Sequence, residues 1–201
     1  MTRRLTRDES SCLVRLVTAR YIMNYDKPAS EEALSQLLFL TLYTRAKRDG
    51  SLTLLGKPRA RFPVLFRLLG APFIPIDRLT RIVGAGDVVR VGSGYSIQNP
   101  GRAFGESYNA LVQGGLKDLA DYAVWVVDEY GGHSEDSLIE LSMNILKLSP
   151  IVRAMAFNMS LDAYLRVRRG LRRVFESGEY VDEEELCPEL FTYNSFSSTP
   201  S

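Results

Sequence analysis

The chain of 201 residues has few of the side chains that build metal centres, disulfides or catalytic pairs. It contains two cysteines, Cys12 and Cys187, and a single histidine, His133. The cysteines lie far apart in the sequence and neither belongs to a CxxC pair, so the ligand spacing of a zinc site is missing. A lone histidine without an adjacent nucleophile or carboxylate pair is no catalytic signature. We therefore expect no metal site, no cofactor, no catalytic residues and no enzymatic activity.

Long apolar runs are missing too. No run reaches the roughly 18 residues that span a bilayer, and the first residues, MTRRLTRDESS, lack the apolar core of a signal peptide. Hydrophobic residues make up 45% and charged residues 24% of the chain, as in ordinary globular proteins. We expect a cytoplasmic protein with reduced thiols that does not bind membranes.

The net charge is only +1, which argues against a uniformly basic nucleic-acid-binding protein. The charge is unevenly distributed, however, because the segment 57–102 has eight basic and two acidic residues, a local balance of +6. Of the 25 basic residues in the chain, 20 are arginine, whose planar guanidinium suits bidentate phosphate contacts. A preference for arginine is also typical of GC-rich or thermophilic genomes, so composition leaves the partner open.

Helical periodicity and capping residues predict a mainly α-helical chain. We expect helices over about 8–24, 30–50, 61–69, 75–83, 102–130, 134–148 and 151–176. Asp8 or Ser10 is the expected cap of the first helix, and Gly114-Gly115 interrupts the long helix 102–130. The sequence SLTLL, which begins at Ser51, is a short strand candidate.

The glycines in the stretch RIVGAGDVVRVGSGYSIQNPGRAF first suggest a nucleotide-binding loop. A dinucleotide fingerprint needs a strand before its glycines and a helix after them. Here the order is reversed, because Gly84 and Gly86 follow a predicted helix and precede the strand formers DVVRV. We therefore interpret the stretch as a helix stop followed by a β-hairpin, with GSG as its turn and YSIQN as its second strand.

The order of elements from Ser30 to Arg102 resembles the winged helix-turn-helix superfamily of transcription regulators. The segment IDRLTRIVGAGDVVRVGSGYSIQNPGRAF carries the resemblance, since its end is similar to the Y-x-L-T-x-x-G motif of many such regulators, with Tyr95, Ile97 and Gly101 at the matching positions. The resemblance implies a mainly α fold with a small β-hairpin wing, in which the helix 75–83 lies in the major groove of DNA.

A second resemblance covers a shorter run. The residues after Leu116, KDLADYAVWVVDEYGGHSEDSLIELSMNI, are similar to the end of Panacea-type (SocA-like) antitoxin domains. Those domains are similar to winged helices that neutralise a toxin through protein contacts. This resemblance implies a protein partner in place of DNA.

The winged-helix interpretation nominates DNA-binding residues. Arg78 and Arg81 lie three residues apart and share a helix face, with Thr80 close by, whereas Ile76, Leu79, Ile82 and Val83 supply the core stripe. In the wing, Arg90 alternates with Val89 and Val91 and is expected to point away from the core. The wing turn Ser93-Gly94 lets the backbone approach a phosphate. Three further basic residues precede the helix 61–69 and are expected to contact phosphates: Lys57, Arg59 and Arg61. Each of these positions is also compatible with an ordinary solvated surface charge.

The leading interpretation is a transcription regulator that binds double-stranded DNA through a winged helix-turn-helix over 30–102. Residues 1–29 are expected to form an N-terminal helix, 103–187 a C-terminal helical extension for dimerisation or partner binding, and 188–201 a flexible tail. Long apolar helices outside the winged domain favour a homodimer, and Trp125 is expected in the core or the dimer interface. The alternative is a winged-helix protein-interaction module, either an antitoxin-like adaptor or a subunit of a larger complex, which the near-neutral net charge favours.

Overall fold

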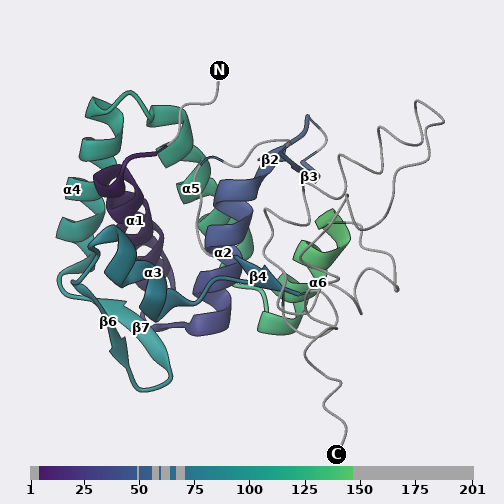
Figure 1. Cartoon of the computed structure of the whole chain (residues 1–201), viewed down its shortest axis with the longest axis horizontal. Coiled ribbons are helices and arrows are strands. Elements are labelled where there is room, and N and C mark those ends of the chain that lie inside the picture. The colour runs from purple at the N-terminus through teal and green to yellow at the C-terminus, as the bar shows by residue number, and fades with distance from the viewer. Residues whose placement is uncertain (1–4, 49, 56–58, 60–63, 67–70, 147–201) are drawn as a thin grey trace, which may run out of the picture. The chain divides into compact units, whose positions relative to one another are not determined.

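The computed structural model describes residues 5–48, 50–55, 59, 64–66 and 71–146, and in this part the protein is mainly α-helical with small antiparallel sheets, as predicted (Figure 1). Contacts divide the chain into two units, one with residues 1–63 and 73–147 and one with residues 64–72 and 148–201. Almost all described residues belong to the first unit. Among them, no helix is long and apolar enough to cross a membrane.

Helix α1 (Arg7–Tyr25) begins at a capping box. The Thr6 hydroxyl accepts a hydrogen bond from the Glu9 amide at 3.2 Å, and the Glu9 carboxylate accepts one from the Thr6 amide at 2.8 Å. The cap therefore lies two residues before the predicted Asp8, because only Thr6 has its partner glutamate at the third helical position. The inner face of α1 is fully buried and packs against α4 (Pro100–Gln113) and α5 (Lys117–Tyr130).

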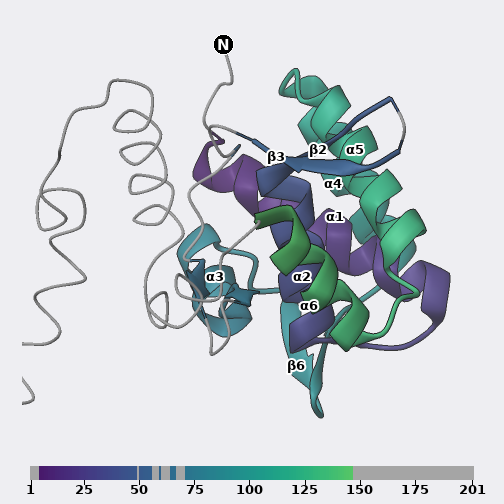
Figure 2. The ribbon, with the colours of Figure 1, turned by 90° about the vertical axis from the view of Figure 1, so that its right-hand side faces the viewer.

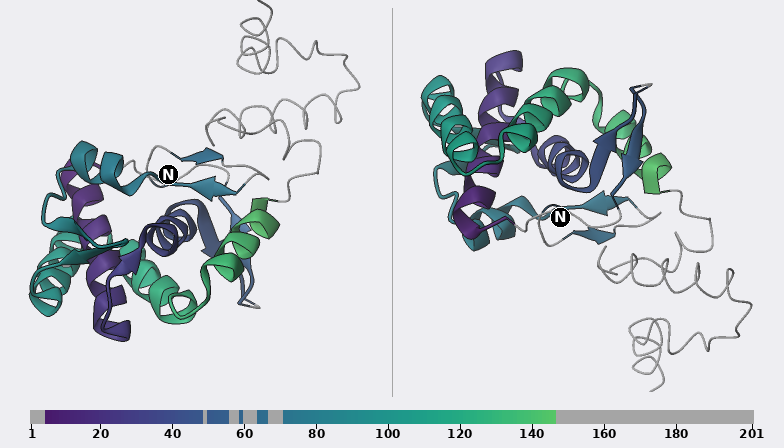
Figure 3. Two further views of the ribbon diagram at one scale, coloured as in Figure 1. Left: turned by 90° about the horizontal axis from the view of Figure 1, so that it is seen from below. Right: turned by 90° about the horizontal axis from the view of Figure 1, so that it is seen from above.

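Helix α2 (Glu31–Tyr43) is the centre of this unit. It begins at Ser30, whose side chain accepts a hydrogen bond from the Ala33 amide, and all residues from Ala33 onward are buried. Helix α2 lies between α1 and α6 (Glu135–Leu146), as Figures 2 and 3 show. A helix with this much buried circumference is the core element that its sequence predicted.

The predicted extension of α2 to Gly50 is wrong. The helix ends at Tyr43, and the chain turns into strand β2 (Thr44–Ala46), which pairs antiparallel with β3 (Leu52–Leu54). The Arg59 guanidinium donates to the carbonyl of Thr41, and the amides of Arg59 and Leu55 donate to the carbonyls of Leu42 and Tyr43, so the acceptors that a longer helix would use are already taken. The strand predicted in SLTLL is confirmed as β3.

A three-stranded antiparallel sheet has the order β1-β7-β6. It consists of β1 (Ala29–Ser30), β7 (Gly94–Ile97) and β6 (Val88–Val91), and helix α3 (Ile76–Val83) precedes β6 in the chain. Helix α3 ends at Gly84, which has a φ of 78°. The predicted helix 75–83 and the β-hairpin after it are confirmed.

The segment in which the helix 61–69 was predicted has a different structure. The expected helix 61–69 is wrong at Leu65–Phe66, which form strand β4 and pair with β5 (Pro72–Phe73). A short run of large apolar side chains fits a buried strand as well as a short helix. Periodicity over so few residues cannot distinguish the two structures. The other residues of that segment lie outside the described part of the chain.

The C-terminal helices follow the prediction more closely. The break at Gly114-Gly115 separates α4 from α5, and Gly115 has a φ of 74°. Helix α6 begins after Ser134, whose side chain accepts a hydrogen bond from the Ser137 amide. The predicted domain boundaries at 29/30 and 102/103 both fall inside the first compact unit. The predicted helix 151–176 and the tail 188–201 lie outside the described residues.

Candidate nucleic-acid interface

The outer face of α3 carries two arginines that face solvent. Arg78 and Arg81 are exposed, whereas Ile76, Leu79 and Val83 are buried against the core. Arg81 donates only to the backbone carbonyl of Asp77, at 3.0 Å. In the described part of the chain, neither arginine forms an ion pair.

The exposures of Thr80 and Ile82 on α3 are the reverse of those predicted. Thr80 is only 8% exposed and its hydroxyl bonds the carbonyl of Asp77, whereas Ile82 is 51% exposed. With about 100° of rotation per residue, 76, 79, 80 and 83 form one stripe and 78, 81 and 82 the opposite one. The outward stripe is therefore two arginines and an isoleucine, and Thr80 does not belong to it.

Arg90 lies on the α3 side of the hairpin, although its side chain is still 53% exposed. Along β6, Val88 is buried and Arg90 shares its side of the sheet, whereas Val89 and Val91 are 44% and 49% exposed. The Arg90 guanidinium lies 3.5 Å from the Asp77 carboxylate. Arg90 is exposed as predicted, but it shares its side of β6 with the buried Val88 and pairs with Asp77, which the predicted alternation did not anticipate.

Asp77 ties α3 to the hairpin. Its carboxylate accepts a hydrogen bond from the Tyr95 hydroxyl at 2.7 Å, in addition to its ion pair with Arg90. Burial and the hydrogen bond to Asp77 raise the pKa of Tyr95 well above its ordinary value. This contact between α3 and the hairpin was not predicted, although Tyr95 stands in the motif that carried the winged-helix resemblance.

The hairpin turn is one residue earlier than expected. Gly92, with a φ of 62°, and Ser93 form the two-residue turn, and Val91 pairs with Gly94 across it. Ser93 is exposed at the tip, but Gly94 is buried. A Cβ at Gly94 would lie 2.8 Å from the carbonyl oxygen of Ala29, so this glycine serves the close approach of β1 and β7 and not a ligand.

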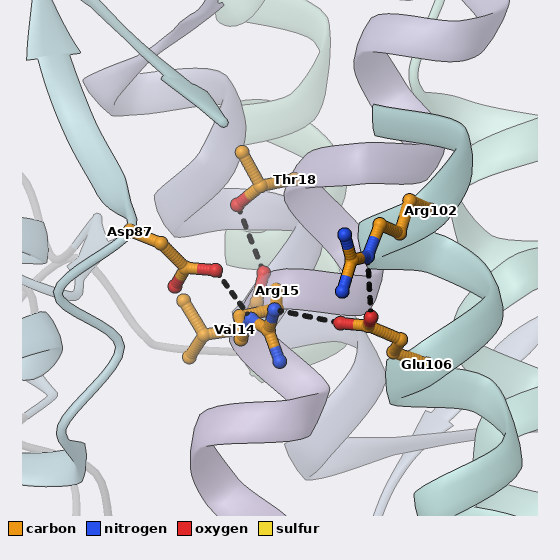
Figure 4. A network of polar contacts seen from close by, with 6 residues as sticks. All are labelled: Val14, Arg15, Thr18, Asp87, Arg102 and Glu106. Carbon is orange, nitrogen blue, oxygen red and sulfur yellow. Dashed lines mark hydrogen bonds and ion pairs between the residues drawn. The ribbon is translucent and has the colours of Figure 1, made fainter. Parts of the chain in front are cut away.

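A second ionic network fixes the start of the hairpin (Figure 4). Arg15 of α1 donates to Asp87, just before β6, at 2.7 Å and lies 3.6 Å from Glu106 of α4. Glu106 also pairs with Arg102 at 2.7 Å, and this hydrogen bond lowers the pKa of its carboxylate. The two acidic residues of the segment 57–102, Asp77 and Asp87, are therefore both paired, and Arg78 and Arg81 have no counterion among the residues that the structure describes.

Arg59 is held away from the α3 surface. It is half-buried at the end of α2, where its guanidinium donates to the carbonyls of Thr41 and, at 2.9 Å, Thr44. It also lies 4.6 Å from the ring centre of Tyr122, and burial lowers its pKa. Arg59 caps a helix C-terminus, a role that nothing in its local sequence signals. The two other basic residues nominated near it, Lys57 and Arg61, lie outside the described residues.

Comparisons with known proteins add no relative. No family model, no curated protein and no solved structure matches this chain. Among the described residues, no group of three or more His, Cys, Asp or Glu side chains gathers where it could hold a metal ion. The function therefore has to be argued from the surface around α3 and the β6–β7 hairpin.

Proposed function

We propose that this protein is a winged-helix transcription regulator that binds double-stranded DNA as a homodimer through α3 and the β6–β7 hairpin. Its order of elements, α1, β1, α2, α3, β6 and β7, and the sheet order β1-β7-β6 support the winged helix. In this arrangement α1 belongs to the DNA-binding domain, and α2 takes the position expected for the helix 61–69. The wing is the β6–β7 hairpin.

The observation that carries the proposal is the free charge on α3. Arg15, Arg90 and Arg102 are each within 3.5 Å of a carboxylate, whereas Arg78 and Arg81 are exposed without one. A guanidinium that has no ion-pair partner loses only bound water, and no salt bridge, when it binds a phosphate or the edge of a guanine. The pair on one helix face suits a helix that enters the major groove.

Charge-removing variants of α3 test the proposal. The double variant R78A/R81A is expected to weaken binding to a random-sequence duplex by more than tenfold at low salt. Each lost phosphate contact should also reduce the slope of log K against log salt by about 1. Binding is measured by electrophoretic shift or fluorescence anisotropy at two or more salt concentrations.

The matched control is R102A/K117A. It removes the same formal charge from α4 and α5, where both side chains already pair with carboxylates. This control should keep wild-type affinity. Absent or salt-insensitive duplex binding by the wild-type protein, or equal losses in both variants, would contradict the proposal.

A protein-interaction module is the second candidate, and the exposed apolar residues of the wing favour it. Val89 and Val91 lie on β6, the edge strand of its sheet, and Ile82 is the exposed apolar residue of α3. Valines on an unprotected edge strand suit pairing with a protein better than contact with phosphates. Purification from the native host with a stoichiometric protein and no nucleic acid would place this candidate first.

A further inference from the structure

We infer that the β2–β3 hairpin and the adjoining face of α5 form a second binding surface, which takes single-stranded nucleic acid. This surface goes beyond the proposed duplex-binding role of α3 and does not depend on it. Three features carry the inference: exposed cations on the hairpin, a guanidinium at its base that pairs with no carboxylate among the described residues, and a series of aromatic rings in contact with one another on α5.

The hairpin presents three exposed basic side chains. Arg45 lies on β2, and Lys47 and Arg48 follow it into the turn. In the described part of the chain, none of the three forms an ion pair. Exposed cationic side chains that have no ion-pair partner among the described residues are suited to the evenly spaced charges of a phosphate backbone.

Arg59 adds a positive charge at the base of the hairpin. Its guanidinium is half-buried, and its hydrogen bonds go to the carbonyls of Thr41 and Thr44 and not to a carboxylate. A partly desolvated charge that lacks an opposite charge is costly, and burial accordingly lowers the pKa of Arg59. An anionic ligand at the hairpin would relieve this cost.

Aromatic rings lie beside Arg59 at the base of the hairpin, where its guanidinium is 4.6 Å from the ring centre of Tyr122. The hydroxyls of Thr44, at the start of β2, and Tyr122 of α5 are 2.7 Å apart. Tyr122 stacks on Trp125 with ring centres 5.5 Å apart, and Trp125 meets Tyr130 edge-on at 5.7 Å. All three rings are only half-buried, so part of each remains open to solvent.

The rings select the kind of polyanion. Unpaired bases stack on half-exposed aromatic side chains, whereas a duplex keeps its base faces inside the helix. An acidic peptide would meet the cations but would leave the rings unused. Phosphate-suited cations next to stacking platforms therefore favour a single strand.

This surface is separate from α3. Strand β1 precedes the N-terminus of α2 and strand β2 follows its C-terminus, and the 13 residues of α2 span about 20 Å. Figure 1 shows the β6–β7 and β2–β3 hairpins at opposite ends of α2. Variants can therefore disable one surface and leave the other intact.

Trp125 is the single tryptophan of the chain, which makes it a direct probe of base stacking. The full chain is titrated with a mixed-sequence DNA strand of about 12 nucleotides, and with the same sequence as a duplex. Fluorescence of Trp125 and anisotropy of the labelled DNA are recorded together. We expect the single strand to quench Trp125 in a saturable manner and the duplex to leave it unchanged.

The variant R45A/K47A/R48A removes the three exposed cations. It is expected to raise the Kd for the single strand at least tenfold and to reduce its salt slope by about 2, since each phosphate contact on a single strand contributes about 0.7. Because these side chains are exposed, their loss leaves the core untouched. The matched control K27A/R78A/R81A removes three other exposed cations and should still bind the single strand.

The two proposals fail separately in this experiment. Duplex binding that is lost in R78A/R81A, without any single-strand binding by the wild type, would overturn only the second surface. Equal quenching of Trp125 by the duplex or by polyglutamate would also overturn it, because neither offers unpaired bases. Unchanged single-strand binding by R45A/K47A/R48A would have the same consequence.

Discussion

At position 94 the sheet has no room for a side chain. A Cβ there would lie 2.8 Å from the carbonyl oxygen of Ala29 and 3.1 Å from the Cβ of Pro28. Both neighbours belong to the strand that pairs with β7 or to its entry, so neither can move without breaking the pairing. We therefore expect G94A to lower the free energy of unfolding by about 1–3 kcal/mol, measured by urea denaturation.

Gly86 is the matched control for this prediction. It also lies near the hairpin, but nothing approaches within 4 Å of the position of its Cβ, and its φ is not positive. The variant G86A should therefore remain within about 0.5 kcal/mol of the wild type. If both alanine variants were equally stable, the close approach of β1 and β7 would not limit position 94.

Between elements, one carboxylate of α5 forms polar contacts with α1 at the edge of their buried interface. Asp128 accepts hydrogen bonds from the Arg20 guanidinium at 2.7 and 2.8 Å and from the Asn24 amide at 2.8 Å. The geometry is bidentate, which is the arrangement in which a surface ion pair contributes measurably. We expect D128A to destabilise the protein by about 1 kcal/mol, as measured by thermal or urea unfolding.

The neighbouring exposed residue Glu129 provides the control, because E129A removes the same charge without a comparable pair. Burial raises the pKa of Asp128, but the hydrogen bonds from Arg20 and Asn24 outweigh it and lower the pKa overall. The difference between D128A and wild type should thus be present at neutral pH and disappear as the pH falls below about 4. A difference that is independent of pH would contradict the ionic origin of this contact.

For the whole molecule, stability should fall at alkaline pH. Burial is the main cause that raises the pKa values of Tyr21, Tyr95, Tyr122 and Tyr130 above the ordinary value of 10.0. Above that pH the unfolded chain loses these protons while the folded protein retains them, so the free energy of unfolding decreases. Thermal unfolding midpoints from pH 8 to pH 11 should be flat at first and fall beyond about pH 10.

Two tyrosines can be removed to check this origin. Y95F and Y122F each lose one of the shifted hydroxyls but keep the aromatic ring. Their combination should make the alkaline fall shallower, even if it lowers stability at neutral pH through the lost bonds to Asp77 and Thr44. A profile as steep as that of the wild type would show that other groups cause the fall.

Short-range sequence signals were sufficient to predict the positions of most helices and strands. Ser30 and Ser134 cap helices as their sequence context predicts, Gly84 and Gly115 end or interrupt helices with positive φ, and a glycine-containing turn follows the β-branched strand β6. Each of these features depends on residues within a few positions of one another. The mainly helical fold, the hairpin and the free arginines of α3 could therefore be predicted.

Contacts between residues that are distant in the sequence determine the features that could not be predicted. Arg15 and Asp87 are 72 residues apart in the sequence, and Thr44 and Tyr122 are 78 residues apart. Neither pair can therefore be recognised from the local sequence pattern. The early end of α2, the ion pair of Arg90 with Asp77 and the position of Arg59 over the Tyr122 ring all involve contacts between residues that are not neighbours in the sequence. Periodicity reports which residues share a face, but the partner across the fold decides which face is buried and which charge stays free.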